Sequence, residues 1–334
     1  GYDGGKFSRE EFILPELIST LWSARDKAKA SKNTALSQAI KIIMNSFYGI
    51  LGTVGCRFLD SRLVSSITKR GHEILIQSKN FIEDAGYQVI YGDTDSVFVL
   101  LGSVPDDQVN VIGEGLTTQL NAWWTNRLRE KYDISSFLEL EFETHFSKFL
   151  MPTVRGSDAG SKKRYAGLVV DNSNPKKSHL LFKGLESVRS DWSPLAREFQ
   201  KELYRRVFFG EPYEDYIKLT VQQLTDGKYE SELVLRKRLR RKLKDYIKNV
   251  PPHAQAARKA EDIRRQLELP SLYQSGGWIE YIMTINGAEP RQYRESAIDF
   301  EFYIERQLAP IADAILAFKS SSMDKILNNQ IGLF

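Results

Sequence analysis

The sequence predicts an α+β fold in which an antiparallel sheet core carries helical segments at both ends. Residues 7–53 show helical periodicity, with leucine and isoleucine at positions i, i+3, i+4 and i+7 of their first half. Two runs rich in β-forming residues, 88–91 and 97–100, flank a turn-forming Gly-Asp-Thr-Asp sequence. Helical character returns after Asp191. These three observations together predict the α+β class.

Composition places the chain among globular proteins of two or three domains. It has 334 residues, of which 42% are hydrophobic and 27% charged, and domains hold about 100–200 residues each. We expect no membrane partner, because no apolar run approaches the roughly 18 residues of a span. Cys56 is the single cysteine, so no internal disulfide is expected and a cytosolic location is indicated. The four histidines lack metal-ligand spacing, so no zinc is expected.

The first 53 residues predict two helices joined by a polar break at 31–34. Ser8 and Glu11 have the spacing of a capping box at the start of the first helix. The second helix is expected over about 35–49, where a glycine ends it. Its predicted buried face is an apolar stripe formed by Leu36, Ile40, Ile43 and Phe47.

The opposite face of the second helix collects three polar or aromatic side chains. Lys41, Asn45 and Tyr48 lie within an arc of about 60° when each residue advances the helix by about 100°. A cation, an amide and a flat ring suit the phosphates, sugar and base of a nucleoside triphosphate, although an ordinary exposed face has the same pattern. On the first helix, Arg25 and Lys29 share a face and would repel each other unless an anion lay between them.

The predicted hairpin places two carboxylates at its turn. Asp93 and Asp95 lie in a Gly-Asp-Thr-Asp-Ser sequence with no basic residue to neutralise them. Carboxylates held at rigid strand ends suit Mg²⁺, which takes oxygen ligands from one or two carboxylates, waters and phosphates. The alternative is an Asp-rich β-turn without a ligand.

Further along the chain, the order of elements remains mixed. We expect helices over 60–85 and about 108–130, strand-like segments at 137–151 and 164–170, and a domain boundary near residue 190. The helical part after Asp191 has one β-like interruption at 278–285. A basic run stands out in this part: eight Lys or Arg residues lie between Arg236 and Lys248 against one acid, Asp245. It indicates a polyanion partner, or else a solvated basic helix face.

Taken in order, five of these segments resemble the motifs of family B DNA polymerases. They are Lys-Ile-Ile-Met-Asn-Ser-Phe-Tyr-Gly at 41–49, Tyr-Gly-Asp-Thr-Asp-Ser at 91–96, Lys-Lys-Arg-Tyr-Ala-Gly at 162–167, Lys-Gly-Leu-Glu-Ser-Val-Arg at 183–189, and the segment 236–253. The resemblance implies a palm built on an antiparallel sheet, a helical-hairpin fingers subdomain and a mostly helical thumb. It implies these boundaries: 1–11 as the end of an upstream palm segment, 12–53 as fingers, 54–190 as palm, and 191–334 as thumb with a clamp-binding tail.

The same resemblance implies a role for each matching residue. Arg25, Lys29, Lys41, Asn45 and Tyr48 would bind the incoming dNTP, and Asp95 with Asp93 would hold the catalytic metal, two Mg²⁺ ions in a complete enzyme. Primer–template DNA would contact Lys163, Tyr165, Arg236, Arg238, Arg240 and Arg241. Gln330, Leu333 and Phe334 would bind a bacterial sliding clamp.

One family motif is not found in these 334 residues. It is an Asp-x-x-Ser-Leu-Tyr-Pro-Ser-like strand that supplies another metal-ligating aspartate. Because the chain begins Gly-Tyr-Asp without a methionine or leader pattern, we expect a cut end. The parent would carry out DNA-templated DNA synthesis in replication or repair, in the bacterial cytoplasm near the nucleoid, and the 334 residues alone would be inactive. A non-catalytic DNA-binding module is the alternative; an RNA polymerase or reverse transcriptase is disfavoured by the paired helices at 7–53.

Overall fold

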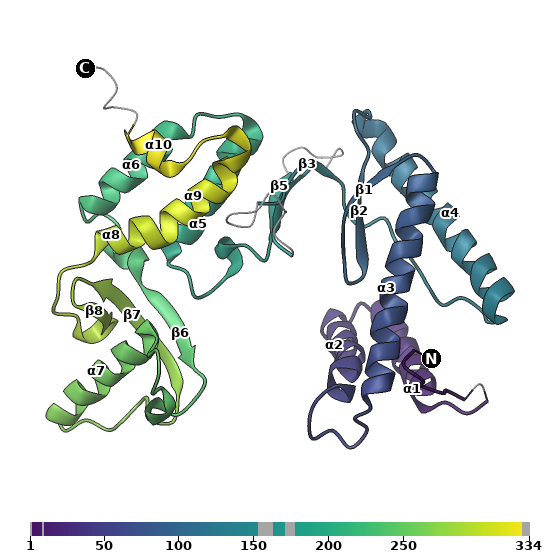
Figure 1. Ribbon diagram of the computed structural model, residues 1–334, viewed down its shortest axis with the longest axis horizontal. Helices are drawn as coiled ribbons and strands as arrows, with labels where there is room; N and C mark the ends of the chain where they lie inside the picture. Colours follow the sequence, from purple (N-terminus) through teal and green to yellow (C-terminus); the bar gives the residue numbers. More distant parts are fainter. Residues whose placement is uncertain (1, 9, 153–162, 171–177, 329–334) are drawn as a thin grey trace. The chain divides into compact units, whose positions relative to one another are not determined.

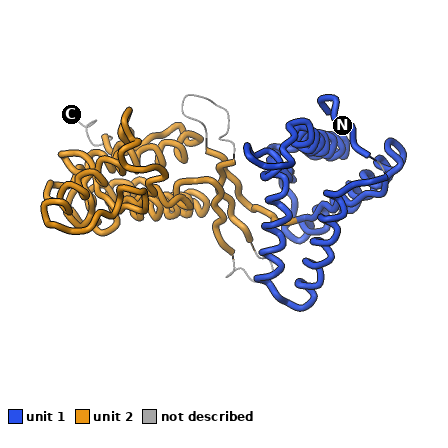
Figure 2. Tube along the Cα trace, turned by 90° about the horizontal axis from the view of Figure 1, so that it is seen from below, with its two compact units in different colours: residues 1–142 blue, residues 143–334 orange. Residues whose placement is uncertain are grey.

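The computed structural model describes residues 2–8, 10–152, 163–170 and 178–328. The chain divides into two compact units, unit 1 (residues 1–142) and unit 2 (residues 143–334), shown in different colours in Figure 2. Both units mix helices with antiparallel strands, which agrees with the predicted α+β class. The predicted boundaries at residues 11, 53 and 190 stay predictions. Among the described residues, no helix combines the length and apolar character that a membrane span needs.

Unit 1 contains the helices and the hairpin that the sequence predicts (Figure 1). Its elements are α1 (Ile13–Ala30), α2 (Thr34–Leu51), α3 (Ser61–Asp84), β1 (Gln88–Asp93), β2 (Ser96–Leu100) and α4 (Asp106–Tyr132). Asn33 caps α2, since its side chain accepts a hydrogen bond from the Leu36 N–H at 3.0 Å. The prediction that Ser8 and Glu11 form a capping box at the start of the first helix is wrong. Ser8 Oγ does accept from the Glu11 N–H at 3.0 Å, but α1 begins only at Ile13.

The core of unit 1 lies between α3, α4 and the hairpin. Ile82, Leu120 and Trp124 are buried there, and the hairpin valines at 89, 97 and 99 pack against them. Trp124 Nε1 donates to Ser78 Oγ at 2.9 Å, which satisfies the indole N–H inside this core. The hairpin is therefore held on two helices by its apolar face.

Helix α2 buries a narrower stripe than the sequence predicts. Ile40 and Leu51 are buried and Phe47 is half-buried, whereas Leu36 and Ile43 remain 48% and 49% exposed. The buried positions follow one line of the helix, which packs against α1 and α3. The prediction of Leu36 and Ile43 as buried is therefore wrong, because neither neighbouring helix covers the edges of the apolar face.

Unit 2 contains two antiparallel sheets and a set of helices. Sheet β3-β4-β5 consists of β3 (Phe146–Leu150), β4 (Tyr165–Val169) and β5 (His179–Lys183), and sheet β6-β7-β8 of β6 (Leu235–Leu239), β7 (Gly277–Thr284) and β8 (Gly287–Pro290). The helices are α5 (Pro194–Phe209), α6 (Glu214–Thr225), α7 (Pro252–Gln266), α8 (Phe300–Tyr303), α9 (Ala309–Leu316) and α10 (Met323–Asn328), with a π-helical turn at Ile304–Leu308 between α8 and α9.

The strands of unit 2 differ from the prediction at four places, since β3 is shorter than expected and β5, β6 and β8 were not predicted. The expected strand at 137–151 forms only over Phe146–Leu150. Strands β4 and β7 confirm the predictions at 164–170 and 278–285. Strand β6 was not predicted, and it corrects the interpretation of the basic run as a helix face.

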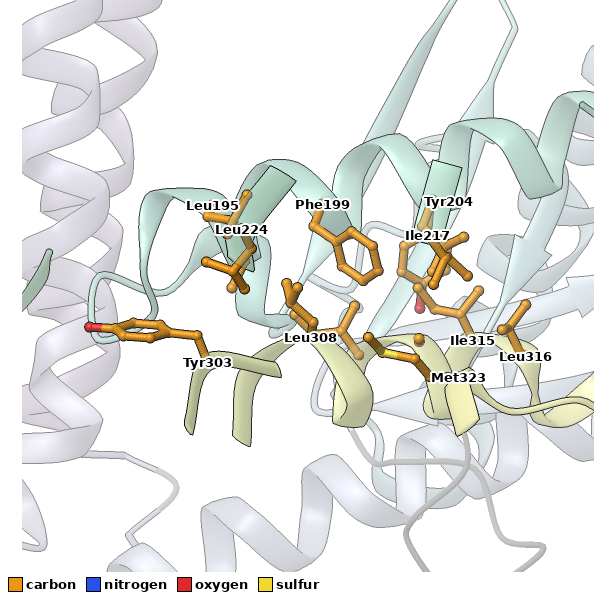
Figure 3. Packing of buried hydrophobic residues seen from close by; sticks show 14 of the residues in the cluster. Leu195, Phe199, Tyr204, Ile217, Leu224, Tyr303, Leu308, Ile315, Leu316 and Met323 are labelled. Atoms are coloured by element: carbon orange, nitrogen blue, oxygen red, sulfur yellow. The ribbon is translucent and has the colours of Figure 1, made fainter. Parts of the chain in front are cut away.

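Two apolar clusters hold unit 2 together. In the larger one, side chains of α5 and α6 point toward those of α8, α9 and α10 (Figure 3). Phe199, Ile217 and Ile315 are almost fully buried there. In the smaller cluster, α7 packs on sheet β6-β7-β8, and its buried alanines at 254, 256 and 257 allow close contact with Ile279 and Tyr281.

Candidate functional site

The two hairpin carboxylates lie at the turn between β1 and β2, as the sequence predicts. Asp93 pairs with Ser96 across the hairpin, so the loop consists of Thr94 and Asp95 alone. The register places Asp93 on the same face as Tyr91, opposite to the face that carries Val97, because side chains alternate along a strand. Asp93 is half-buried and Asp95 is exposed. Both carboxylates are therefore presented away from the apolar core that anchors the hairpin.

The backbone of the turn is tight and strained. Thr94 has a φ of 54°, a left-handed value that β-branched residues rarely adopt. The Asp95 N–H donates to the Asp93 carbonyl at 2.6 Å, which closes a three-residue turn. The side chains of Thr94 and Ser96 donate to Asp93 Oδ1 at 3.0 Å and to Asp95 Oδ1 at 3.3 Å. These bonds restrict the rotation of both carboxylates.

The donor set at this turn fits a hard divalent cation in part. Asp93 and Asp95 supply carboxylate oxygens, which are the ligands that Mg²⁺ takes from proteins alongside waters and substrate phosphates. Within the described ranges, no group of three or more His, Cys, Asp or Glu side chains lies close enough to hold a metal. The turn therefore provides two ligands and leaves the remaining positions to water, substrate or other residues.

The predicted nucleotide-binding face of α2 is exposed, also in unit 1. Lys41, Asn45 and Tyr48 all lie on the solvent side of the helix, and 42% of Tyr48 remains exposed. The Tyr48 hydroxyl is within 2.6 Å of Thr68 Oγ1 on α3. This hydrogen bond fixes the ring at one end while its faces stay accessible.

Helix α1 lies against α2 and carries the two further predicted cations. Lys29 is exposed, and Arg25 is half-buried. The Nε of Arg25 is buried and has no hydrogen-bond partner among the described residues. A buried guanidinium N–H without a partner costs free energy, so an anion that reached it would be bound with a gain.

In unit 2, Tyr165 is the first residue of strand β4, and Lys163 lies in the turn just before it. Lys163 has a φ of 63° and is exposed. Gly184 has a φ of 61°, and a Cβ there would overlap the Lys163 carbonyl oxygen. The Tyr165 ring packs against Phe149 with 5.2 Å between ring centroids. The glycine in the Lys183–Arg189 motif therefore sets the backbone on which Lys163 is presented.

A partly buried network of side chains, of which only Gln200 lies outside the motifs singled out in the sequence, supports the same strand. Arg164 forms an ion pair with Glu186, which is only 8% exposed. Gln200 on α5 donates to Glu186 Oε2 at 2.7 Å and accepts from the Ser187 N–H at 2.7 Å. The network joins β4 to α5 through the motif 183–189. The mixture of charged and small residues in this motif was the sequence signal that could have indicated such a network.

In the basic run, alternate residues of β6 have different surroundings. Arg236 and Arg238 are exposed and pair in register with Glu280 and Trp278 of β7. Lys237 lies on the opposite side of the strand, and its Nζ donates to Asp191 Oδ2 at 3.2 Å. Of these three residues, Arg236 and Arg238 are therefore the candidates for the predicted polyanion contact.

Asp191 is the acid that ties β6 to the segment after β5. Arg189 contacts it through two hydrogen bonds, of 3.0 and 2.9 Å. These bonds, together with Lys237, lower the pKa of the Asp191 carboxyl from 3.8 to about 2. Arg240 and Arg241 follow β6 and are both exposed, and the backbone N–H of Arg240 donates to the Tyr246 hydroxyl at 3.1 Å.

The predicted clamp-binding residues Gln330, Leu333 and Phe334 lie outside the described residues, as does Lys162 of the Lys-Lys-Arg-Tyr motif. The structure brings Arg25, Lys29, Lys41, Asn45, Tyr48, Asp93 and Asp95 into unit 1, and Lys163, Tyr165, Arg236, Arg238, Arg240 and Arg241 into unit 2.

The hairpin with its two turn aspartates and the helix pair with an exposed basic face lie in unit 1, and the strand with outward arginines lies in unit 2. The chain belongs to DNA polymerase family B, whose model matches residues 4–328. DNA polymerase II of Escherichia coli (strain K12) is 51% identical over 335 residues, which cover 100% of this chain and 42% of that protein. The sequence-based assignment to family B is therefore confirmed, and within the family the chain is similar to a bacterial DNA polymerase II.

Similarity extends to archaeal and eukaryotic proteins. A DNA polymerase of Thermococcus gorgonarius is 26% identical over 99% of this chain and 42% of its own length. The DNA polymerase alpha catalytic subunit of Drosophila melanogaster is 27% identical over 82% of this chain and 18% of its own length. The chain thus spans less than half of the length of each of these relatives.

Proposed function

We propose that this chain is the part of a DNA-directed DNA polymerase that binds the dNTP and supplies the hairpin carboxylates for nucleotidyl transfer to a primer 3′-OH. The β1–β2 hairpin supports the proposal most strongly, because a core of two helices anchors it and its turn consists of Asp93, Thr94, Asp95 and Ser96. Membership of family B and a 51% identical DNA polymerase support the same activity.

In this proposal Asp95 and Asp93 hold Mg²⁺ through their carboxylate oxygens, as two hard ligands on a rigid turn. Two such ions, when bound, stabilise the attacking and leaving oxygens of an in-line displacement at phosphorus. The side chains of Thr94 and Ser96 orient the carboxylates through the hydrogen bonds described above. Thus the protein holds its ligand atoms in place before any substrate arrives.

The dNTP is bound by the exposed face of α1 and α2. Arg25, Lys29 and Lys41 neutralise the triphosphate, and Asn45 donates to the sugar or phosphates. Tyr48 provides a flat surface under the new base pair, since its hydroxyl is held by α3 and its ring remains accessible.

Primer–template DNA is held by side chains of unit 2. Lys163 and Tyr165 contact the duplex near the primer end, and Arg236, Arg238, Arg240 and Arg241 contact phosphates. Guanidinium groups on a rigid strand favour such contacts, which fix register and affinity without reading sequence.

A test of the activity uses a chimera in which the upstream part of the Escherichia coli relative precedes these 334 residues. We expect it to extend a primer, and Asp95→Asn to lower turnover by orders of magnitude with primer–template affinity nearly unchanged. Asp106→Asn, at the start of α4, is a matched control that should retain activity. Equal losses of turnover and affinity in Asp95→Asn would indicate a structural role and would contradict the proposal.

The 334-residue polypeptide alone is a separate case. No three acidic side chains of its described residues lie close enough together to hold a metal, and we propose that it binds DNA without extending a primer. In isolation it then acts as a non-catalytic DNA-binding module. Primer extension by the purified polypeptide that depends on Asp95 would overturn this part.

For the end of the chain we propose contact with a bacterial sliding clamp. Gln330, followed closely by Leu333 and Phe334, offers two large apolar anchors, the kind of side chain that dominates small interfaces. Such a tether raises the effective concentration of the polymerase at the primer end. Deleting 330–334 should abolish clamp binding in a pull-down and leave the melting temperature unchanged. Unchanged clamp binding with a lowered melting temperature would mean that the tail packs on unit 2 instead.

A further inference from the structure

A pocket on the outer face of sheet β6-β7-β8 shares only Arg236 with the residues of the function proposed above. It has a volume of about 260 Å³ and is lined by Arg236, Tyr273, Trp278, Glu280, Arg291 and Gln292. Helix α7 covers the other face of this sheet (Figure 1), where Leu235, Ile279 and Tyr281 are buried. The outer face therefore has arginines and an indole at positions that do not serve this core.

Trp278 is the central feature of the pocket. This large aromatic side chain is 49% exposed, although the next residue along β7, Ile279, is buried. The guanidinium carbon of Arg236 lies 4.8 Å from the centre of the Trp278 ring. This cation–π contact stiffens both side chains and creates a flat, partly apolar surface with N–H donors at its edge.

The remaining lining residues give the pocket polar edges and a net positive charge. Arg291 forms an ion pair with Glu280 at 3.0 Å, which leaves the charge of Arg236 unbalanced within the pocket. Gln292 adds an amide that can both donate and accept hydrogen bonds. Burial raises the pKa of the Tyr273 phenol, so the hydroxyl group of this lining residue is uncharged at neutral pH. A flat wall, an amide and an excess positive charge suit a planar heterocycle attached to an anion.

We infer that this pocket binds a single unpaired nucleobase of single-stranded DNA by stacking on Trp278 and Arg236. Its volume lies below the roughly 300–1,000 Å³ of pockets for larger ligands, which suits one ring system rather than a whole nucleoside triphosphate. A base within a duplex is stacked on both sides and cannot enter, so the strand must be unpaired there. The exposed residues Arg238, Arg240 and Arg241 then lie next to the strand's phosphates.

The inference goes beyond the proposed polymerase activity, and it rests on that function only in taking DNA as the polymer. It differs from the duplex contacts of the basic run, because those depend on phosphates alone. A base in the pocket adds an interaction that depends on the presence of the base itself.

The experiment measures the affinity of the 334-residue chain for a short labelled oligothymidylate and for an abasic oligonucleotide with the same number of phosphates. Stacking on an aromatic residue predicts that Trp278→Ala weakens oligothymidylate binding about 5- to 150-fold. Trp278→Leu keeps an apolar side chain at this position but should lose as much oligothymidylate affinity as Trp278→Ala. Trp278→Phe keeps an aromatic ring and should retain most of the affinity. Binding of the abasic strand should be the same in all of these variants.

Phe318 offers a matched control in the same unit. It is 53% exposed and has the Lys319 ammonium 5.5 Å from its ring centre, yet it lines no part of the pocket. Phe318→Ala should therefore leave oligothymidylate affinity unchanged. The inference is overturned if Trp278→Ala and Trp278→Leu bind oligothymidylate as tightly as the wild type, or if they lose equally on the abasic strand. Duplex primer–template affinity, measured in parallel, reports separately on the proposed function.

Discussion

Removing the charge of Asp191 should destabilise unit 2 at neutral pH. Arg189 and Lys237 hold this carboxylate, and 24% of its side chain is exposed. The hydrogen bonds from Arg189 are the main cause that lowers its pKa from 3.8 to about 2. A difference of nearly two pKa units corresponds to about 2 kcal/mol, so Asp191→Asn should lower the free energy of unfolding by about that amount at pH 7.

The pH dependence tests the electrostatic cause. A carboxyl whose pKa is lower in the folded state contributes its full stability above the unfolded pKa of 3.8, and loses it as the pH falls toward about 2. The difference between wild type and Asp191→Asn should therefore be constant from about pH 5 to 7 and shrink below about pH 4.

Urea unfolding followed by circular dichroism at several pH values measures this difference. Asp262→Asn is the matched control, because Asp262 pairs with Arg265 at 3.3 Å but is 63% exposed. An exposed helix pair of this kind contributes about 0.3–0.5 kcal/mol. The reasoning is refuted if Asp191→Asn lowers the free energy of unfolding no more than the control does. It is also refuted if that loss does not change with pH, since the charge of Asp191 would then not stabilise unit 2.

Three further outcomes follow from the geometry. The double variant with Arg238→Ala and Arg241→Ala should reduce the slope of log affinity for DNA against log salt concentration by about 1.8, and an unchanged slope would mean that neither residue contacts phosphate. Gly184→Ala should cost about 2–3 kcal/mol of unfolding free energy, because its Cβ meets a backbone oxygen, whereas Gly210→Ala, with a similar φ of 70° and no atom within 4 Å, should cost about 1 kcal/mol. Thr94→Gly should stabilise unit 1 by up to about 1 kcal/mol by relieving a φ of 54°, and a lowered melting temperature would show that the threonine side chain matters more than its backbone strain.

Local signals in the sequence were sufficient to predict the hairpin and the helices α1 and α2. The turn residues 92–95 between two β-rich runs determine a two-residue loop, and helical spacing places Lys41, Asn45 and Tyr48 on one exposed face. Which apolar residues are covered depends on neighbouring helices, so the exposure of Leu36 and Ile43 could not be read from periodicity.

Strand β6 was not predicted because its sequence does not show the alternation of apolar and polar residues that is typical of a strand. Leu235 and Leu239 are buried, but the inward position between them is occupied by Lys237. Its ammonium reaches Asp191, a partner 46 residues away in sequence, so three consecutive basic residues look like a solvated segment. A tertiary ion pair thus determines a strand that local propensity does not indicate.

The unequal size of the buried clusters has a consequence for the order in which the two units unfold. In unit 2 one large cluster joins five helices, whereas the described core of unit 1 between α3, α4 and the hairpin centres on Ile82, Leu120 and Trp124. Regions with fewer buried apolar contacts open first under heat, protease or isotope exchange. Under the proposed function, partial unfolding of unit 1 would disrupt the two-aspartate turn while β6 stays folded, so a DNA-binding assay would overestimate the fraction of active protein.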